Sequence, residues 1–177
     1  MTDWKELLEG LRKLTKSEPE NAVAWYNLGF AYANLTRYDE AIEAFRQATR
    51  IDPEDAKAWG NLGVTYDTLT RYDDAIEAYH QVIRINPEHA KAWHSLGIAY
   101  GRLDQYGNAI EAFRQATRIN PEDAHAWYNL GFAYRNLNRS DDAIAAYREA
   151  LRIDPENAPP GTFLIFPTKF EIWDNPW

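Results

Sequence analysis

Apolar residues recur along the chain in blocks that repeat at a fixed distance. The segment AWYNLGFAY begins at Ala24, and similar segments begin at Ala58, Ala92 and Ala126, each 34 residues after the previous one. Within these segments the apolar side chains are three or four residues apart, which is the spacing of one face of an α-helix. A fixed period of this length indicates a repeat array in which each unit packs mainly against its neighbours.

Each repeat is expected to form two antiparallel helices. In the first repeat, Asn21 is a candidate N-cap for a helix that reaches about Leu35. The link Thr36-Arg37 is short, so the next helix returns alongside the first and ends before Pro53, which disfavours helical geometry at the residue preceding it. The four predicted repeats are residues 22–55, 56–89, 90–123 and 124–157.

The two ends of the chain depart from this pattern. Residues 1–21 are predicted to hold one helix that covers the open face of the first repeat, with Asp3 and Glu6 spaced as a capping box. Residues 158–177 are rich in large apolar side chains and in proline, which forbids a continuing helix. The predicted fold class is all-α, a solenoid of two-helix repeats with an N-terminal capping helix and a non-helical apolar C-terminal tail.

A glycine occupies the same place inside the first helix of every repeat, at Gly29, Gly63, Gly97 and Gly131. A glycine inside a helix costs about 1 kcal/mol relative to alanine. We therefore expect the missing side chain to let the two helices of one repeat approach closely. The small residues at the matching point of the second helix are Ala41, Ala75, Ala109 and Ala143.

The spaced residues of the repeats resemble those of the tetratricopeptide repeat family. In the first repeat they are Trp25, Leu28, Gly29, Tyr32, Ala41, Phe45, Ala48 and Pro53, and in the fourth they are Trp127, Leu130, Gly131, Tyr134, Ala143, Tyr147, Ala150 and Pro155. The resemblance implies a right-handed superhelix of helix pairs, in which the first helix of each pair lines a concave groove. It also implies a scaffold that holds a peptide or a partner protein, and not an enzyme.

The family's geometry selects the side chains that we expect to contact a peptide in this groove. In the first two repeats they are Tyr26, Asn27, Phe30, Lys57, Asn61 and Val64. In the last two they are Lys91, His94, Ser95, Ile98, Arg102, His125, Tyr128, Asn129 and Phe132, and Arg135 is expected on the same side. Aromatic and aliphatic side chains serve as interface anchors. The expected ligand is therefore an extended peptide with bulky apolar side chains.

Asparagines recur in register among these positions, at Asn27, Asn61 and Asn129, and Ser95 stands at the third step. An asparagine amide offers an acceptor and two donors, which suits the N–H and C=O groups of an extended backbone. The arrangement is similar to the asparagine ladder in the repeat domain of O-linked N-acetylglucosamine transferases. The alternative is that these asparagines brace neighbouring repeats.

The apolar tail is a candidate ligand for the groove through Phe163, Phe166, Phe170 and Trp173. It could occupy the groove of its own molecule or that of a second one, which would make the protein a self-assembling module. Two alternatives remain open. The tail could fold over the last helix and cover its apolar face, or it could be a disordered segment that binds a partner.

Composition narrows the function further. The formal net charge of −8 argues against binding to nucleic acid or anionic membranes, and the absence of cysteine excludes disulfides and cysteine metal sites. No apolar run reaches the roughly 18 residues of a membrane span, and the first residues lack the layout of a secretion signal, so a cytoplasmic location is expected. His94 and His125 are too few for a zinc site. We expect no catalysis, metal or cofactor, a peptide or protein partner, and possible homo-oligomers through the tail.

Overall fold

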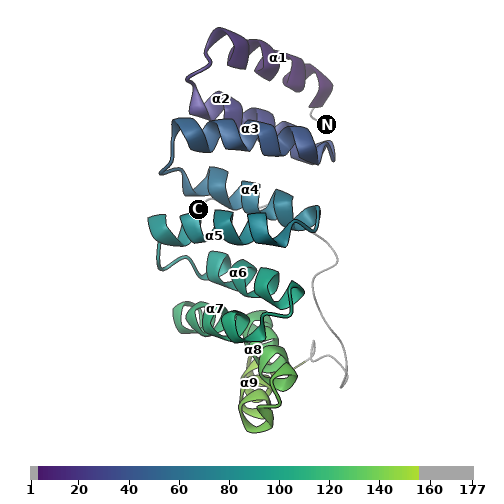
Figure 1. Cartoon of the computed structure of the whole chain (residues 1–177), viewed down its shortest axis with the longest axis vertical. Helices are drawn as coiled ribbons and strands as arrows, with labels where there is room; N and C mark the ends of the chain where they lie inside the picture. The colour runs from purple at the N-terminus through teal and green to yellow at the C-terminus, as the bar shows by residue number, and fades with distance from the viewer. Residues whose placement is uncertain (1–3, 156–177) are drawn as a thin grey trace. The chain divides into compact units, whose positions relative to one another are not determined.

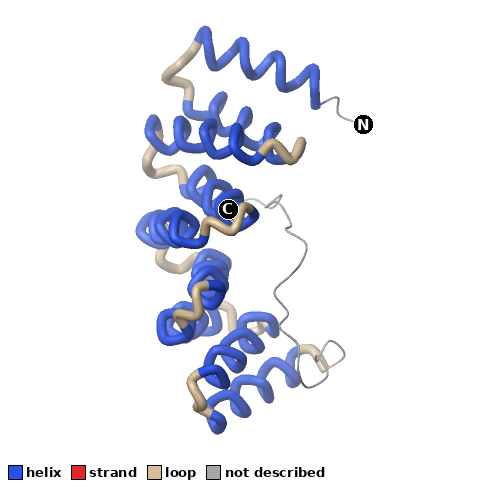
Figure 2. Tube along the Cα trace, turned by 45° about the vertical axis from the view of Figure 1, so that its right-hand side comes forward, coloured by secondary structure: helices blue, strands red, loops and turns tan. Residues whose placement is uncertain are grey.

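The structure is a computed structural model that describes residues 4–155. The predictions on Asp3 and on the tail residues Phe163, Phe166, Phe170 and Trp173 lie outside the described residues and stay predictions. Within residues 4–155 every regular element is an α-helix, and short turns connect the helices (Figure 2). These residues fall into two units, which meet in the chain between Ile85 and Asn86.

The first unit is built from helices α1 to α5 (Figure 1). Their bounds are α1 Trp4–Ser17, α2 Ala22–Asn34, α3 Tyr38–Ile51, α4 Ala56–Thr68 and α5 Tyr72–Ile85. The helices α2 and α3 pack as one pair and α4 and α5 as another, while α3 packs on α4. The helix α1 packs on α2 and buries Leu8 and Leu11, so the predicted capping helix is confirmed.

The second unit contains helices α6 to α9 in its described part (Figure 1). Their bounds are α6 Ala90–Arg102, α7 Tyr106–Ile119, α8 Ala124–Asn136 and α9 Ser140–Ile153. The pairs α6–α7 and α8–α9 are joined by packing of α7 on α8. The core between α7, α8 and α9 is formed by buried alanines together with Ile110, Phe113, Leu130 and Tyr134.

The first helix of each repeat begins at a polar N-cap residue. The side chains of Asn21, Asp55 and Asp123 accept hydrogen bonds from backbone N–H groups in the first turn, which confirms the predicted N-cap at Asn21. In α6 the cap is His89, whose Nδ1 accepts from the N–H of Ala92 at 3.1 Å. Each cap satisfies a backbone donor that has no partner within its own helix.

Two residues after each of these helices ends, one residue has left-handed backbone geometry. These residues are Thr36, Thr70, Asp104 and Asn138, with φ between 56° and 59°. In the first repeat the N–H of Thr36 donates to the C=O of Ala33, and the N–H of Arg37 donates to the C=O of Tyr32, both at 2.9 Å. This is a Schellman motif, which ends a helix and turns the chain toward the next one.

The repeated glycines lie against aromatic rings of the second helix in each pair. A Cβ atom added to Gly29 would lie 2.7 Å from Cδ1 of Phe45, and the equivalent rings are those of Tyr79, Phe113 and Tyr147. The predicted close approach is confirmed, but the group opposite the glycine is the aromatic ring and not the alanine four residues before it. A methyl group at Gly29 would occupy space that the ring already fills.

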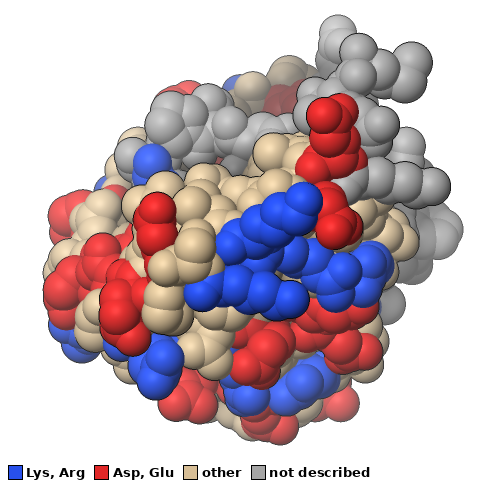
Figure 3. All heavy atoms as spheres, turned by 90° about the horizontal axis from the view of Figure 1, so that it is seen from above, with Lys and Arg blue, Asp and Glu red and all other residues tan. Residues whose placement is uncertain are grey.

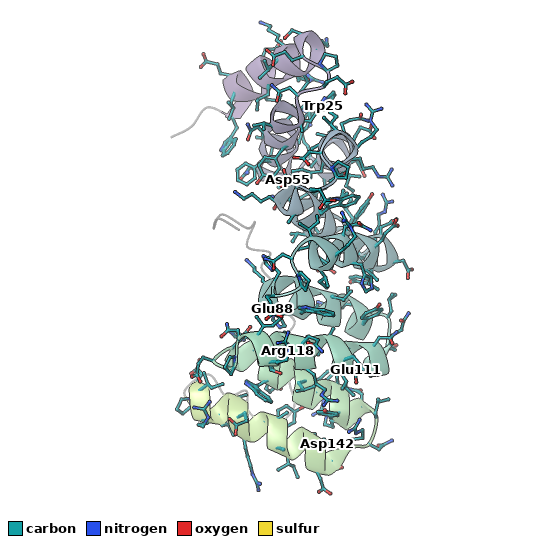
Figure 4. All side chains as sticks on the ribbon, turned by 90° about the vertical axis from the view of Figure 1, so that its left-hand side faces the viewer. Trp25, Asp55, Glu88, Glu111, Arg118 and Asp142 are labelled. Atoms are coloured by element: carbon teal, nitrogen blue, oxygen red, sulfur yellow. The ribbon has the colours of Figure 1, made fainter. Side chains whose placement is uncertain are left out.

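A hydrogen bond connects the tryptophan of each repeat to the proline six residues before it. The indole Nε1 of Trp25, labelled in Figure 4, donates to the C=O of Pro19 at 2.9 Å. The same bond joins Trp59 to Pro53, Trp93 to Pro87 and Trp127 to Pro121, at 2.8 to 3.0 Å. The bond fixes the turn before each first helix, which explains why both residues recur with the same period.

Exposed ion pairs connect successive repeats inside each unit. Arg84 pairs with Glu54 in the first unit, and Arg118 pairs with Glu88 in the second, each at 2.8 Å; Figure 4 labels the second pair. All four side chains are at least half exposed, so each pair contributes at most about 1 kcal/mol. On the face that Figure 3 shows, lysine and arginine lie beside aspartate and glutamate, and neither sign covers that face alone.

Candidate peptide-binding surfaces

The predicted contact residues lie on the less buried side of the first helices. In α6, Ala92, Leu96 and Ala99 are fully buried, while Lys91 and Arg102 are exposed. The remaining predicted contacts divide into exposed, half-buried and buried groups. Asn27, Lys57 and His125 are exposed; Tyr26, Phe30, Val64, His94, Ser95, Ile98, Tyr128 and Phe132 are half-buried; Asn61 and Asn129 are buried.

In the first unit, aromatic rings form a continuous cluster on this side. The ring centroids of Tyr26 and Phe30 are 6.5 Å apart and the rings are nearly parallel. Trp4 of α1 lies 6.3 Å from Phe30, and Phe45 of α3 lies 5.9 Å from Tyr26. Sequence reasoning assigned Trp4 only to the capping helix, although its contact with Phe30 extends the candidate surface to α1.

The two buried asparagines connect successive first helices. The Nδ2 of Asn61 donates to the hydroxyl of Tyr26 at 3.1 Å, and Asn129 Nδ2 lies 2.9 Å from Nε2 of His94. Each bond spans 35 residues and therefore joins one repeat to the next. This geometry is that of the bracing alternative, and backbone binding by Asn61 and Asn129 stays a prediction. Asn27, in contrast, has an exposed side chain.

His94 is neutral in this setting. Burial lowers the pKa of His94 below its usual 6.5, the nearby Asp123 raises it in part, and His125 and Lys91 lower it further. A neutral imidazole can accept the hydrogen bond from Asn129 at Nε2, whereas a protonated one would have no acceptor to offer. His125 is therefore an electrostatic neighbour of His94, but no group of three or more metal-ligating side chains exists among residues 4–155.

In the second unit the aromatic side chains surround an arginine. The ring centroids of Tyr128 and Tyr147 are 5.1 Å apart, and those of Tyr106 and Phe132 are 6.2 Å apart with an edge-on arrangement. The Cζ atom of Arg135 lies 5.1 Å from the ring centroid of Phe132. Arg135 was expected on this side but not selected as a contact, although its spacing of three residues from Phe132 on one helix is a sequence signal for their contact.

A cleft of about 540 Å³ lies among α1, α2 and α3 of the first unit. Basic side chains of α1, including Arg12 and Lys16, and the acidic Glu40 and Glu43 of α3 line it. Trp25, Leu28 and Tyr32 also line this cleft. Because both charge signs are present, the lining favours no particular class of ligand. Sequence reasoning did not predict this cleft, which depends on how α1 sits beside the pair α2–α3.

Comparison with known proteins identifies the family. Tetratricopeptide repeat models match residues 22–55, 56–89 and 94–158, which together are most of the chain. The chain belongs to the tetratricopeptide repeat family. No curated protein sequence matches it. Within the described residues, no helix of this tetratricopeptide repeat protein is both long and apolar enough to cross a membrane.

Solved structures show the same fold. The crystal structure of MamA aligns at a TM-score of 0.83 with 26% sequence identity, over 88% of this chain and 91% of MamA. MamA from Desulfovibrio magneticus RS-1 aligns at a TM-score of 0.79 with 24% identity, over 87% of each chain. YrrB, described as a tetratricopeptide repeat protein with an unusual peptide-binding site, aligns at 0.80 with 22% identity, over 88% of this chain and 80% of YrrB. The predicted all-α fold of two-helix repeats with an N-terminal capping helix is confirmed, and the predicted tail lies outside the described residues.

Proposed function

We propose that this protein is a non-catalytic scaffold that binds an extended peptide with apolar or aromatic side chains in the groove that its first helices are expected to line. The observation that carries the proposal is the set of half-buried aromatic rings there. Tyr26, Phe30, Tyr128 and Phe132 each present part of a large ring on a helix whose other side is buried in the core. Tetratricopeptide repeat proteins as a family are protein-interaction scaffolds.

The packing of the rings favours binding over a purely structural role. Helices α2 and α8 bury Leu28 and Leu130 in the core, so the folding of each repeat already has its apolar anchor. A ring that is only half-buried gains further free energy when a ligand covers the rest of it. The rings are also held by neighbours, such as Trp4 against Phe30, so little side-chain freedom is lost on binding.

A peptide-binding measurement tests this proposal. The probe is a fluorescein-labelled peptide of twelve residues with phenylalanine at alternate positions, and its match has serine in place of each phenylalanine. Fluorescence anisotropy on the full chain should show binding of the first peptide and much weaker binding of the second. Phe132→Ser should weaken binding about tenfold, because truncating an anchor in an interface costs more than about 1 kcal/mol.

The matched control is Ile144→Ser on α9, where an apolar side chain is 48% exposed on a second helix. This variant should bind the phenylalanine peptide as the wild type does. Equal binding of the two peptides, or equal loss in Phe132→Ser and Ile144→Ser at unchanged helical content, would contradict the proposed surface.

A further inference from the structure

Charged residues are divided unequally between the helices of the second unit. The first helices, α6 and α8, carry Lys91, Arg102 and Arg135 and contain no aspartate or glutamate. All acidic residues within helices of this unit lie on the second helices, α7 and α9. The protein as a whole has a formal net charge of −8. The charged residues within the first helices of this unit are therefore all basic, in contrast to the chain as a whole.

Arg135 lies beside the aromatic residues of α8. Its guanidinium carbon lies 5.1 Å from the centroid of the Phe132 ring, and the side chain is exposed. Among the described residues, Arg135 forms no ion pair, whereas Arg118, Arg139 and Arg152 of the same unit each pair with a carboxylate. The Phe132 ring therefore holds the guanidinium of Arg135 by a cation–π contact, and no carboxylate of the described residues pairs with its charge.

Two phenols interact electrostatically with the same guanidinium. Burial raises the pKa of Tyr128 and of Tyr147, and the positive charge of Arg135 lowers both in part, so the three groups interact. The hydroxyl of Tyr147 is buried and has no hydrogen-bond partner among the described residues. A buried donor without a partner is uncommon in folded proteins. The cluster thus combines aromatic surface with one buried hydroxyl, that of Tyr147, that has no hydrogen-bond partner among the described residues.

The first repeat supplies an internal comparison. Its helix α2 reads AVAWYNLGFAYAN and α8 reads AHAWYNLGFAYRN, so the two differ only at Val23 against His125 and at Ala33 against Arg135. On the following helix, Phe45 stands in place of Tyr147. The first and fourth repeats therefore present the same pair of aromatic residues, a tyrosine and a phenylalanine. In the first repeat they lie on a helix without charged residues, and in the fourth they share a helix with Arg135.

We propose that Arg135, together with Phe132 and Tyr128, binds a peptide segment in which an aromatic side chain is followed by a carboxylate. The inference rests on the proposed function and names the ligand of its second-unit surface. The aromatic side chain packs on the ring of Tyr128 or Phe132, and the carboxylate accepts hydrogen bonds from the guanidinium. Lys91 and Arg102 on α6 add positive potential. Helix α6 is joined to α8 by the bond between His94 and Asn129.

Three labelled peptides test the inference on the full chain. Each has three phenylalanines, and the residue after each phenylalanine is glutamate in the first, glutamine in the second and lysine in the third. The glutamate peptide should bind about tenfold more tightly than the glutamine peptide, because a hydrogen bond between ionised groups is about twice as strong as a neutral one. The lysine peptide should bind more weakly than both.

Variants assign the effect to Arg135. Arg135→Gln should weaken binding of the glutamate peptide about tenfold and binding of the glutamine peptide much less, so that most of the difference between the two peptides is lost. The matched control, Arg148→Gln, removes an exposed arginine from α9 and should keep the full difference. Circular dichroism verifies that both variants are folded.

The outcomes separate the two proposals. If the glutamate and glutamine peptides bind equally well and better than a serine-matched peptide, the acidic preference is wrong and the peptide-binding function stands. If the preference survives undiminished in Arg135→Gln, another cation carries it and the assignment is wrong. If no phenylalanine peptide binds better than its serine match, the proposed function itself fails.

Discussion

The substitution Gly29→Ala tests how tightly the two helices of a repeat are packed. The added Cβ atom would lie 2.7 Å from Cδ1 and 2.8 Å from Cε1 of Phe45, whereas ordinary van der Waals contact begins near 3.4 Å. The ring must therefore move by about 0.7 Å, the difference between 3.4 and 2.7. Phe45 is only 1% exposed, so protein atoms surround it and it has no free space to move into.

The magnitude follows from two opposing terms. Replacing glycine by alanine in the interior of a helix stabilises by about 1 kcal/mol, and overpacking a core costs about 1–3 kcal/mol. Gly10 in the middle of α1 is the matched control, because a Cβ added there would meet no atom within 4 Å. Both variants gain the helix term, so their difference isolates the packing term. We expect Gly29→Ala to be less stable than Gly10→Ala by about 1–3 kcal/mol.

Urea unfolding followed by circular dichroism measures this difference. The double variant Gly29→Ala with Phe45→Leu supplies a second readout, since a smaller side chain relieves the clash. Phe45→Leu should destabilise the Gly29→Ala background less than it destabilises the wild type, with a coupling energy of about 0.5 kcal/mol or more. If Gly29→Ala and Gly10→Ala stabilise the protein equally, the ring yields without cost, and close packing does not explain the repeated glycine.

Two further predictions concern pH and the turn after the first helix. Lowering the pH from about 7 to about 5 should reduce the free energy of unfolding. Burial lowers the folded-state pKa of His94 below 6.5 and that of His89 to about 4. Below about pH 6.5 these histidines bind protons in the unfolded chain but not in the folded chain. Urea titrations should therefore show that the free energy of unfolding falls toward pH 4. The fall should be less steep in His94→Gln. Thr36→Gly should raise the free energy of unfolding by up to about 1 kcal/mol, because φ is 58° at this position and a β-branched residue is strained there. Thr36→Ala should give a smaller gain. A loss of stability in the glycine variant would contradict the presence of strain at Thr36.

The repeat pattern predicted much of the fold because its signals act locally. The helix N-cap at Asn21 needs only a side-chain acceptor three residues before a backbone N–H, and it was found where the sequence places it. The glycine at position 29 predicted a close approach, since a residue that is unfavourable in a helix needs a packing reason. The ring that fills the space lies sixteen residues later, and its position depends on how the two helices cross.

The candidate site was predicted less completely. The resemblance to the tetratricopeptide repeat family selected Tyr26, Phe30, Tyr128 and Phe132 as residues that face the groove, and helical spacing places the two residues of each helix on one face. The sequence left open whether the asparagines face a ligand or a neighbouring repeat. The structure shows Asn61 and Asn129 buried and bonded to residues 35 positions earlier. That bond depends on the distance between successive helices, which sequence spacing does not specify.

By itself, then, the sequence determined the period, the helix boundaries and the sides on which apolar residues gather, since these depend on backbone geometry over a few residues. Only the tertiary structure decided which side chains meet across helices. Two examples are the contact of Trp4 with Phe30 and the burial that lowers the pKa of His94. Each results from the close packing of whole helices against one another, which the spacing of residues along one helix does not specify.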